Sequence, residues 1–334
     1  MSPHEVIAVE LLRTLRGRRS QNGLSRRFGY RTNVVSRWEQ GRYWPSAVRF
    51  LRGCEQLGID VGQCYARMFQ RPPQEGASSS PASGASVAAF LQELRGGTPI
   101  GQLARTAGVN RFTVSRWLKG SACPNLPQFL QIVDAASGRL PDFLSAFVDP
   151  EQLPSVRDEW RRLALLRRLA YEEPWSHAVL RALLLDIHKE GCRSEHIAEA
   201  LGLSPGEVRK LLTILRKAGQ VRKASSGYRA RPTARVETST DPVRARGLKA
   251  AWVRAAAERL ETGAPGLFGY TLFEINRKDL ERVMALQRDC ARAVRAIIRD
   301  SRDTDCVGLY CVQLLDLGAT PDMGASMPSH RADS

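Results

Sequence analysis

The sequence predicts a mainly α-helical chain of several domains, and three observations lead to this fold class. One segment occurs twice, apolar residues recur at helical spacing, and glycines mark the ends of most expected helices. A length of 334 residues is enough for two or more domains. We therefore expect two tandem five-helix bundles, then three helices with a β-hairpin, and last a small α+β domain.

The internal repeat is the first of these observations. When the chain is shifted by 79 residues, positions 12–51 align with 91–130 without a gap, and 15 of the 40 pairs are identical. Ordinary amino-acid usage would give about two or three identities by chance. The identical pairs include Leu24/Leu103, Gly29/Gly108, Val35/Val114, Arg37/Arg116, Trp38/Trp117 and Pro45/Pro124. The chain therefore contains a duplicated module.

Each copy is predicted to begin with three helices. They are expected at residues 4–17, 21–28 and 32–40, and again at 86–96, 100–107 and 111–119. Gly29 and Gly108 follow the second helix of each copy, where a left-handed residue turns the chain. Two short helices joined by such a turn are typical of a helix-turn-helix. Trp38 and Trp117 lie at helical spacing from a valine, so we expect both in the core.

Residues 23–46 and 102–125 resemble the helix-turn-helix of Xre/Cro-type regulators of bacteria and phages. The family pattern has Gln near the start of its second helix, Leu-Ala, Gly in the turn, and then Val/Ile-Ser-x-aromatic-Glu-x-Gly. The first copy matches at Gln21, Leu24, Gly29, Val35, Ser36, Trp38, Glu39 and Gly41. The second copy matches at Leu103, Ala104, Gly108, Val114, Ser115, Trp117 and Gly120. The departures are Ser25 for Ala, Ile100 for Gln and Leu118 for Glu.

This resemblance implies binding of double-stranded DNA, with the third helix of each copy in the major groove. The expected DNA contacts are Gln21, Arg31, Thr32, Asn33, Arg37 and Arg42, and in the second copy Asn110, Arg111, Phe112, Arg116 and Lys119. Arg pairs bidentately with guanine and Asn with adenine, whereas Arg42 and Lys119 are expected at phosphates. Two modules on one chain would read adjacent half-sites and gain affinity from their linkage.

A third helix-turn-helix pattern occupies residues 175–235. Its helices are expected at 175–189, 194–201 and 205–218, with a capping box starting at Ser204. A hairpin at 220–223 and 228–231 completes a pattern typical of a winged helix. Residues that could reach phosphates are Arg209, Lys210, Arg216, Lys217, Arg222, Lys223 and Arg229. The pattern leaves open whether this segment contacts DNA or serves dimerisation or docking.

The C-terminal segment is expected to form an α+β domain. Its helices are predicted at 241–262 and 277–302, and its aromatic and β-branched strands at 268–275 and 306–316. From Trp175 onward the chain resembles an uncharacterised domain that follows an Xre-type module in some bacterial regulators, which implies no activity. This domain could form a homodimer, sense a ligand or contact another protein.

These patterns divide the chain into seven segments. They are a first module (1–71), a Pro/Ser/Gly-rich flexible linker (72–85), a second module (86–148), a connector helix (149–174), a winged-helix-like domain (175–235), an α+β effector or dimerisation domain (236–317) and a disordered tail (318–334). Within the connector, 151–173 is expected to be amphipathic and packed on its neighbours.

The positive charge lies in the parts that carry the three helical patterns. The net charge is 50 − 34 = +16, and the sequence pI is about 10.1. Residues 1–73 carry 13 − 5 = +8, residues 86–145 carry 6 − 3 = +3, and residues 174–235 carry 12 − 5 = +7. Residues 236–334 carry 14 − 14 = 0. A polyanion-binding front and a neutral rear fit this distribution.

Several other classes of function find no support in the sequence. No run of about 18 apolar residues or signal peptide is present, so we expect a cytoplasmic protein without a membrane partner. Seven cysteines without a CxxC pair disfavour a disulfide framework or a zinc finger. His188, Cys192 and His196 are spaced by four, but Gly191 and Ser194 should break a shared helix. With no P-loop or GxSxG motif, no cofactor, metal or enzymatic activity is expected.

The interpretation that follows is a sequence-specific transcriptional regulator, and two alternatives stay open. One is an antitoxin-like protein-interaction module, which the weaker second copy suggests. The other is a DNA-processing enzyme that uses the helix-turn-helix modules for targeting, with Tyr270 or Tyr310 as its nucleophile.

Overall fold

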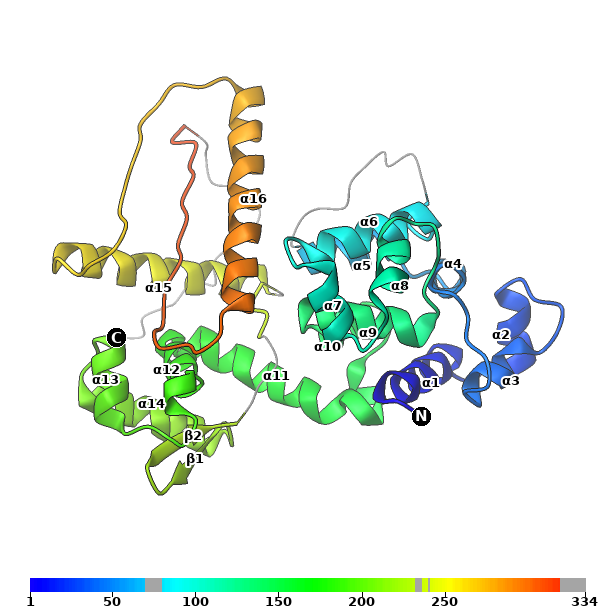
Figure 1. Ribbon diagram of the computed structural model, residues 1–334, viewed down its shortest axis with the longest axis horizontal. Helices are drawn as coiled ribbons and strands as arrows, with labels where there is room; N and C mark the ends of the chain where they lie inside the picture. Colours follow the sequence, from blue (N-terminus) through cyan, green and yellow to red (C-terminus); the bar gives the residue numbers. More distant parts are fainter. Residues whose placement is uncertain (70–79, 232–235, 240, 319–334) are drawn as a thin grey trace, which may run out of the picture.

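The structure is a computed structural model that describes residues 1–69, 80–231, 236–239 and 241–318. Within these residues the chain is mainly α-helical, with one two-stranded sheet. Figure 1 shows helices α1–α10 gathered at one end and α12–α16 at the other, with α11 joining the two groups. No helix in the described part is both long and apolar enough to cross a membrane.

The first ten helices follow the internal repeat. In the first repeat they are α1 (Pro3–Arg16), α2 (Gln21–Arg27), α3 (Val34–Glu39), α4 (Ala47–Gln56) and α5 (Val61–Phe69). In the second they are α6 (Gly84–Arg95), α7 (Ile100–Thr106), α8 (Arg111–Leu118), α9 (Leu126–Ser137) and α10 (Leu140–Leu144). The expected helix at 32–40 begins later, at Val34, because Asn33 caps it by accepting a hydrogen bond from the Ser36 backbone N.

The two repeats share one hydrophobic core. Buried residues from both form a single cluster, in which Phe50, Phe90, Phe129 and Phe143 are at most 3% exposed. Helix α1 of the first repeat packs against α9 of the second, and α4 packs against α6. Trp38 and Trp117 lie in this core, 0% and 3% exposed, which confirms the prediction that both are buried. The repeats are therefore in direct contact, whereas the sequence suggested modules joined only by a flexible linker.

A local twofold relation lies where the repeats meet. An antiparallel bridge joins Ser46 to Asn125. The Ala47 N donates to the Pro124 O at 2.8 Å, and the Leu126 N donates to the Pro45 O at 2.9 Å. Each of these residues lies 79 positions from its counterpart in the other repeat. The contact is therefore self-complementary, as in an isologous dimer interface.

The middle of the chain forms a second core around a hairpin. Its elements are α11 (Pro154–Glu172), α12 (Pro174–Leu183), α13 (Ser194–Leu201), α14 (Pro205–Lys217), β1 (Val221–Ala224) and β2 (Gly227–Ala230), with 3-10 turns at Pro150–Gln152 and Asp186–His188. The hairpin pairs Val221 with Ala230 and Ala224 with Gly227. The Ser204 capping box is present as predicted. The expected helix at 175–189 is too long; it ends at Leu183, and the Asp186 N donates to the Thr304 O at 3.0 Å.

A buried ion network joins the second repeat to the connector. Arg139 and Asp142 come from the α10 region, Arg167 from α11, and Glu237 from the chain after β2. Arg139 Nη1 lies 3.1 Å from Glu237 Oε2, and Arg167 pairs with the Asp142 carboxylate. Burial raises the pKa of Asp142, although Arg167 and Arg139 oppose that shift. Because all four side chains are at most 9% exposed, this network fixes how α11 sits on the repeats.

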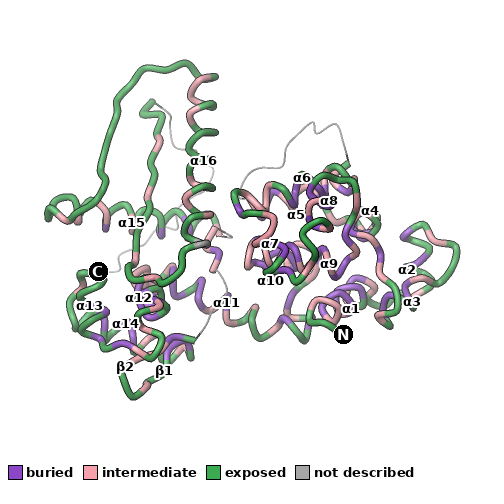
Figure 2. Tube along the Cα trace, viewed as in Figure 1, coloured by how far each residue is buried: buried purple, intermediate pink, exposed green. Residues whose placement is uncertain are grey.

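For residues 236–317 the predicted helices are present, but the prediction of two strands is wrong. The helices are present as α15 (Pro242–Glu261) and α16 (Arg277–Asp300), but the expected strands at 268–275 and 306–316 are extended without a partner. A strand requires a neighbouring ladder, and within the described residues the hairpin is the sole sheet. Figure 2 shows α15, α16 and these extended segments as mostly exposed, whereas burial concentrates in the repeats and around α12–α14.

Candidate nucleic-acid interface

The α2–α3 pair of the first repeat is fixed by short polar contacts. Ser20 Oγ caps α2 by accepting from the Gly23 N at 3.0 Å, and the chain turns at Gly29, whose φ is +77°. Ser25 is fully buried between the two helices. Its Oγ donates to the Gln21 O at 2.8 Å and accepts from the Val35 N at 3.1 Å. Ser25 therefore connects the start of α2 to the start of α3.

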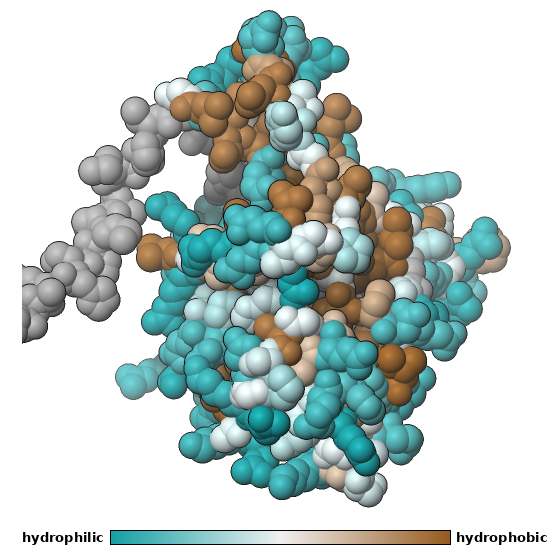
Figure 3. Space-filling model, turned by 90° about the vertical axis from the view of Figure 1, so that its left-hand side faces the viewer, coloured by the Kyte–Doolittle hydropathy of each residue, from teal (hydrophilic) through white to brown (hydrophobic). Residues whose placement is uncertain are grey.

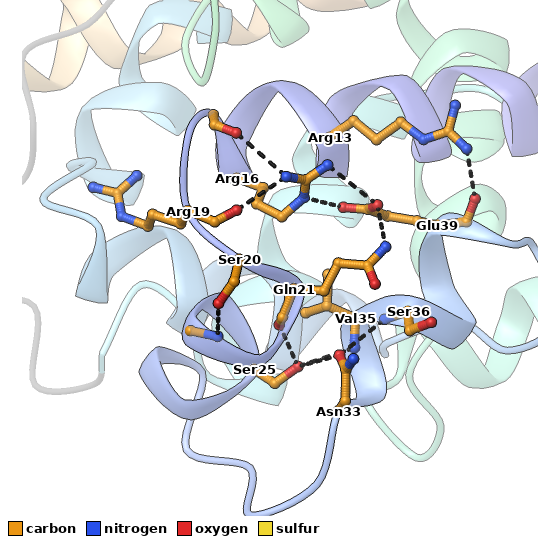
Figure 4. A network of polar contacts seen from close by, with 12 residues as sticks. Arg13, Arg16, Arg19, Ser20, Gln21, Ser25, Asn33, Val35, Ser36 and Glu39 are labelled. Atoms are coloured by element: carbon orange, nitrogen blue, oxygen red, sulfur yellow. Dashed lines mark hydrogen bonds and ion pairs between the residues drawn. The ribbon is translucent and has the colours of Figure 1, made fainter.

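A buried carboxylate holds the same pair against α1. Glu39, 5% exposed, accepts from Arg16 Nε at 2.6 Å and from Gln21 Nε2 at 2.8 Å. Arg13 Nη2 donates to the Glu39 O at 3.1 Å. Figure 4 shows these side chains converging on Glu39 from α1 and α2. We call Arg16, Gln21 and Glu39 the polar clasp.

The predicted DNA contacts of the first repeat divide into two groups. Those exposed around α3 are Arg31, Thr32, Asn33, Arg37 and Arg42. Asn33 is also the N-cap of α3, so its Oδ1 is partly occupied. Gln21 is different because it is half-buried and bound to Glu39. The structure gives Gln21 a positioning role that sequence reasoning missed.

The second repeat exposes a similar but more apolar set. Its predicted contacts Asn110, Arg111, Phe112, Arg116 and Lys119 are all exposed. Phe112 lies in the first turn of α8 and is 74% exposed, so its apolar ring contributes little burial to the fold. The Asn110 Oδ1 caps α8 by accepting from the Phe112 N at 2.8 Å. An open hollow of about 930 Å³ lies beside α7 and the start of α8, and Arg105 and Arg111 are among its lining residues.

No polar clasp is present in the second repeat. The positions of Gln21 and Glu39 are taken by Ile100 and Leu118, and Leu118 is 4% exposed. Two backbone contacts are kept: Gln92 Nε2 donates to the Leu118 O at 2.6 Å, as Arg13 does to the Glu39 O. Arg95 Nη1 donates to the Thr98 O at 2.9 Å, as Arg16 does to the Arg19 O.

The segment around α13, α14 and the hairpin presents a further basic surface. Arg209, Lys210, Arg216, Lys217, Arg222 and Lys223 are exposed, and Arg229 is half-buried. Lys210 Nζ lies 3.1 Å from Glu173 Oε1, and Arg209 lies 3.9 Å from Glu195. These two residues are thus partly neutralised by carboxylates, whereas Arg216 and Lys217 at the end of α14 and Arg222 and Lys223 on the hairpin are exposed to solvent.

The histidines and cysteines of the described residues do not come together as a metal site. No group of three or more His, Cys, Asp or Glu side chains lies close enough there to hold an ion. His188 is in a 3-10 turn, and its Nδ1 lies 2.9 Å from the Ala182 O, whereas His196 is in α13. Burial, with a smaller effect from Arg181, lowers the pKa of His177 to about 4. His177 is therefore uncharged at neutral pH.

Comparison with known proteins relates the second half of this chain to a protein family. Residues 156–315 match the model of a family described as a domain of unknown function, DUF4423. The match begins in α11 and ends after α16, so it covers the second core and the exposed C-terminal segments and leaves out both repeats. No curated protein and no solved structure matches this chain.

Proposed function

We propose that this protein is a sequence-specific, double-stranded DNA-binding transcriptional regulator. In this proposal the α2–α3 and α7–α8 pairs are Xre/Cro-type helix-turn-helix units, and α3 and α8 are their recognition helices. The interpretation of α12–α14 with the hairpin as a winged helix belongs to the same proposal. The resemblance of residues 23–46 and 102–125 to that family supports it, as does the net charge of +16.

The observation that carries the proposal is the twofold relation between the repeats. The Ser46–Asn125 bridge relates equivalent residues, and Arg37 and Arg116 are exposed at equivalent positions of two repeats that share one core. Dimeric repressors bind half-sites related by a twofold axis and about one helical turn apart. One chain would therefore present a preassembled pair of readers. Since the two sets of side chains differ, the half-sites should also differ.

The experiment that tests the proposal is selection of bound sequences from a random duplex library, followed by affinity measurements at about 0.15 M salt. At that salt, non-specific phosphate binding is weakened. We expect a motif with two unequal half-sites. Arg37→Ala should lose about 1–3 kcal/mol of binding free energy and relax the preference at one position of one half-site. Arg116→Ala should do the same in the other half.

Two further variants distinguish recognition of DNA bases from non-specific electrostatic binding to the phosphate backbone. Arg42→Ala should weaken binding to all sequences and lower the salt dependence by about one ion. Arg254→Ala removes the same charge from exposed α15, outside both repeats, and should leave the selected motif unchanged. If no motif emerges, or if Arg37→Ala and Arg254→Ala behave alike, sequence-specific reading by the repeats is wrong.

A second candidate function is favoured by Phe112 alone. An aromatic side chain 74% exposed at the start of α8 suits a protein partner as well as a thymine methyl group. In that case the first repeat reads DNA and the second binds a protein. The selected motif would then have a single half-site, and Phe112→Ala would leave it unchanged.

A further inference from the structure

The C-terminal part of the chain exposes an unusual amount of apolar surface. Of the 23 exposed large hydrophobic side chains in the described residues, 15 lie after Gly266. They belong to α16 and to two extended segments, residues 266–275 and 304–317, which we call the first and second arms. Leu267, Tyr270 and Leu317 are at least 80% exposed. In Figure 3 hydrophobic side chains gather over the upper part of the face that carries these elements. Together they form the rear apolar surface.

The size of this surface argues for a partner. At roughly 100 Å² each, about half of what a large aromatic side chain can bury, 15 side chains present on the order of 1,500 Å². The largest apolar patch on an ordinary monomer is about 300–600 Å². Permanent homodimer interfaces bury about 2,000–5,000 Å² over both partners. Two such surfaces placed face to face fall in that range.

The arms carry the pattern of strands that lack a neighbour. In the first arm Phe268, Tyr270 and Leu272 alternate with the residues between them, as in a strand. Within the described residues, no backbone hydrogen bond joins 266–275 or 305–316 to another segment. Unpaired N–H and C=O groups along an apolar extended segment are a template for pairing with another chain.

Helix α16 carries an apolar seam that fits a copy of itself. The seam residues are spaced 3-4-3-4, the a/d pattern of a coiled coil, and they are Val283, Leu286, Cys290, Ala293 and Ile297. Leu286 and Ile297 are 67% and 72% exposed, and the Cys290 thiol is exposed as well. The second arm runs back along this helix, since Tyr310 Oη lies 3.8 Å from Cys290 Sγ and Asp316 pairs with Arg277 at 3.0 Å. The seam and the second arm thus form one continuous surface.

We propose that a second copy of this chain covers the rear apolar surface, with α16 packed against its counterpart and the arms paired as strands across the interface. Residues 236–334 carry 14 basic and 14 acidic groups, so like charge does not oppose self-association there. The family match extends to residue 315, so α16 and most of both arms belong to the matched domain. The dimer does not depend on DNA binding, and it would bring four repeats into one complex.

The test is the mass of the full chain in solution, measured by light scattering and sedimentation over a wide concentration range. We expect twice 37.1 kDa, and a melting temperature that rises with protein concentration. Tyr270→Lys and Leu272→Lys change side chains that are 92% and 77% exposed, so neither should unfold a monomer. Each should weaken the dimer at least about 30-fold. Ile187→Lys changes a side chain 62% exposed outside this surface and should leave the mass unchanged.

Three outcomes would overturn the dimer. One is a mass of 37.1 kDa at every concentration, with a melting temperature independent of concentration. Another is a dimer that keeps its affinity in Tyr270→Lys and Leu272→Lys, which would place the interface elsewhere. The third is equal loss of the dimer in Ile187→Lys, which would show that the added charge acts nonspecifically. Loss of the dimeric species in the arm variants alone supports the proposal.

Discussion

The first and second repeats follow the same helical path but hold their helices together by different means. In the first, the buried Glu39 carboxylate binds Arg16 and Gln21. In the second, Leu118 and Ile100 occupy the corresponding positions. The backbone contacts from α1 and α6 to the ends of α3 and α8 are the same in both. Apolar side chains at these two positions are therefore compatible with the same arrangement of helices. A carboxylate at the position of Glu39, in contrast, needs Arg16 and Gln21 as hydrogen-bond donors.

The difference between the repeats also changes the role assigned to Gln21, from a DNA contact to a residue that positions α3. Gln21 is the residue that the family resemblance placed near DNA, but its amide donates to Glu39. In the second repeat Ile100 has no such donor, so the side chains at the positions of Gln21 and Glu39 hold α7 and α8 by apolar packing. We infer that the clasp fixes the angle of α3 more narrowly than apolar contact fixes that of α8. Hydrogen exchange can compare the two repeats within one molecule.

The largest effect is expected from Glu39→Ala. Removing the carboxylate leaves the Gln21 amide without its acceptor and the half-buried Arg16 without its ion-pair partner, so that this guanidinium keeps only its contacts with backbone carbonyls. We expect a loss of about 2–4 kcal/mol in the stability of the α2–α3 region. Hydrogen exchange should quicken in α2 and α3, while α7 and α8 provide the internal reference.

The matched control converts the first repeat to the second. Gln21→Ile combined with Glu39→Leu should recover at least half of the stability lost in Glu39→Ala, because a well-packed apolar pair can replace a buried ionic one. If the double variant is no more stable than Glu39→Ala, the equivalence of the two repeats at this position is wrong.

Lowering the pH should destabilise the second core through His177, which lies outside both repeats. The folded-state pKa of His177 is about 4, below its ordinary 6.5, so the unfolded chain takes up the proton first as pH falls. The stability associated with neutral His177 is fully present above pH 6.5 and is lost as pH falls toward 4. The loss should reach about 2 kcal/mol at about pH 5. Exchange in α12 should show this dependence, and His177→Gln should abolish it.

A smaller effect is expected where Ser25 joins α2 to α3. Ser25→Ala leaves the Val35 N without its acceptor and should destabilise the pair by about 1–2 kcal/mol. The second repeat has Ala104 at this position, so Ala104→Ser is the reverse experiment. A stabilising Ala104→Ser would show that the hydroxyl improves either repeat. A destabilising one would show that α7 and α8 are packed too closely for it.

The smallest effect on stability is expected at the start of α3 and α8. Asn33→Ala removes the cap of α3 and should cost about 1 kcal/mol, whereas Phe112→Ala on the exposed surface should cost almost nothing. If the repeats bind DNA as proposed, we expect each variant to weaken binding to the half-site of its own repeat. Thermal unfolding and binding measured on the same samples separate the two effects. A destabilised Phe112→Ala would mean that this ring has a structural role.

Much of the helical structure could be predicted from local signals. The 79-residue repeat, the turn glycines and the Ser204 capping box each act within a few residues of chain, so α1–α3, α6–α8 and α14 appear close to their expected bounds. The burial of Trp38 and Trp117 followed from spacing alone. Most of the exposed Arg and Asn residues around α3 and α8 were also identifiable, because they precede the buried valine of each helix or lie between it and the buried tryptophan.

Other features depended on contacts between residues far apart in sequence. The sequence determined that this chain has duplicated helical modules, a basic front and a neutral rear. Only the tertiary structure decided that the repeats share a core across the Ser46–Asn125 bridge, and that Gln21 is held by Glu39. It also decided that residues 268–275 and 306–316 are extended without pairing. Helix ends follow from local backbone and side-chain preferences, whereas strands, ion pairs and interfaces exist only when a distant partner is brought alongside.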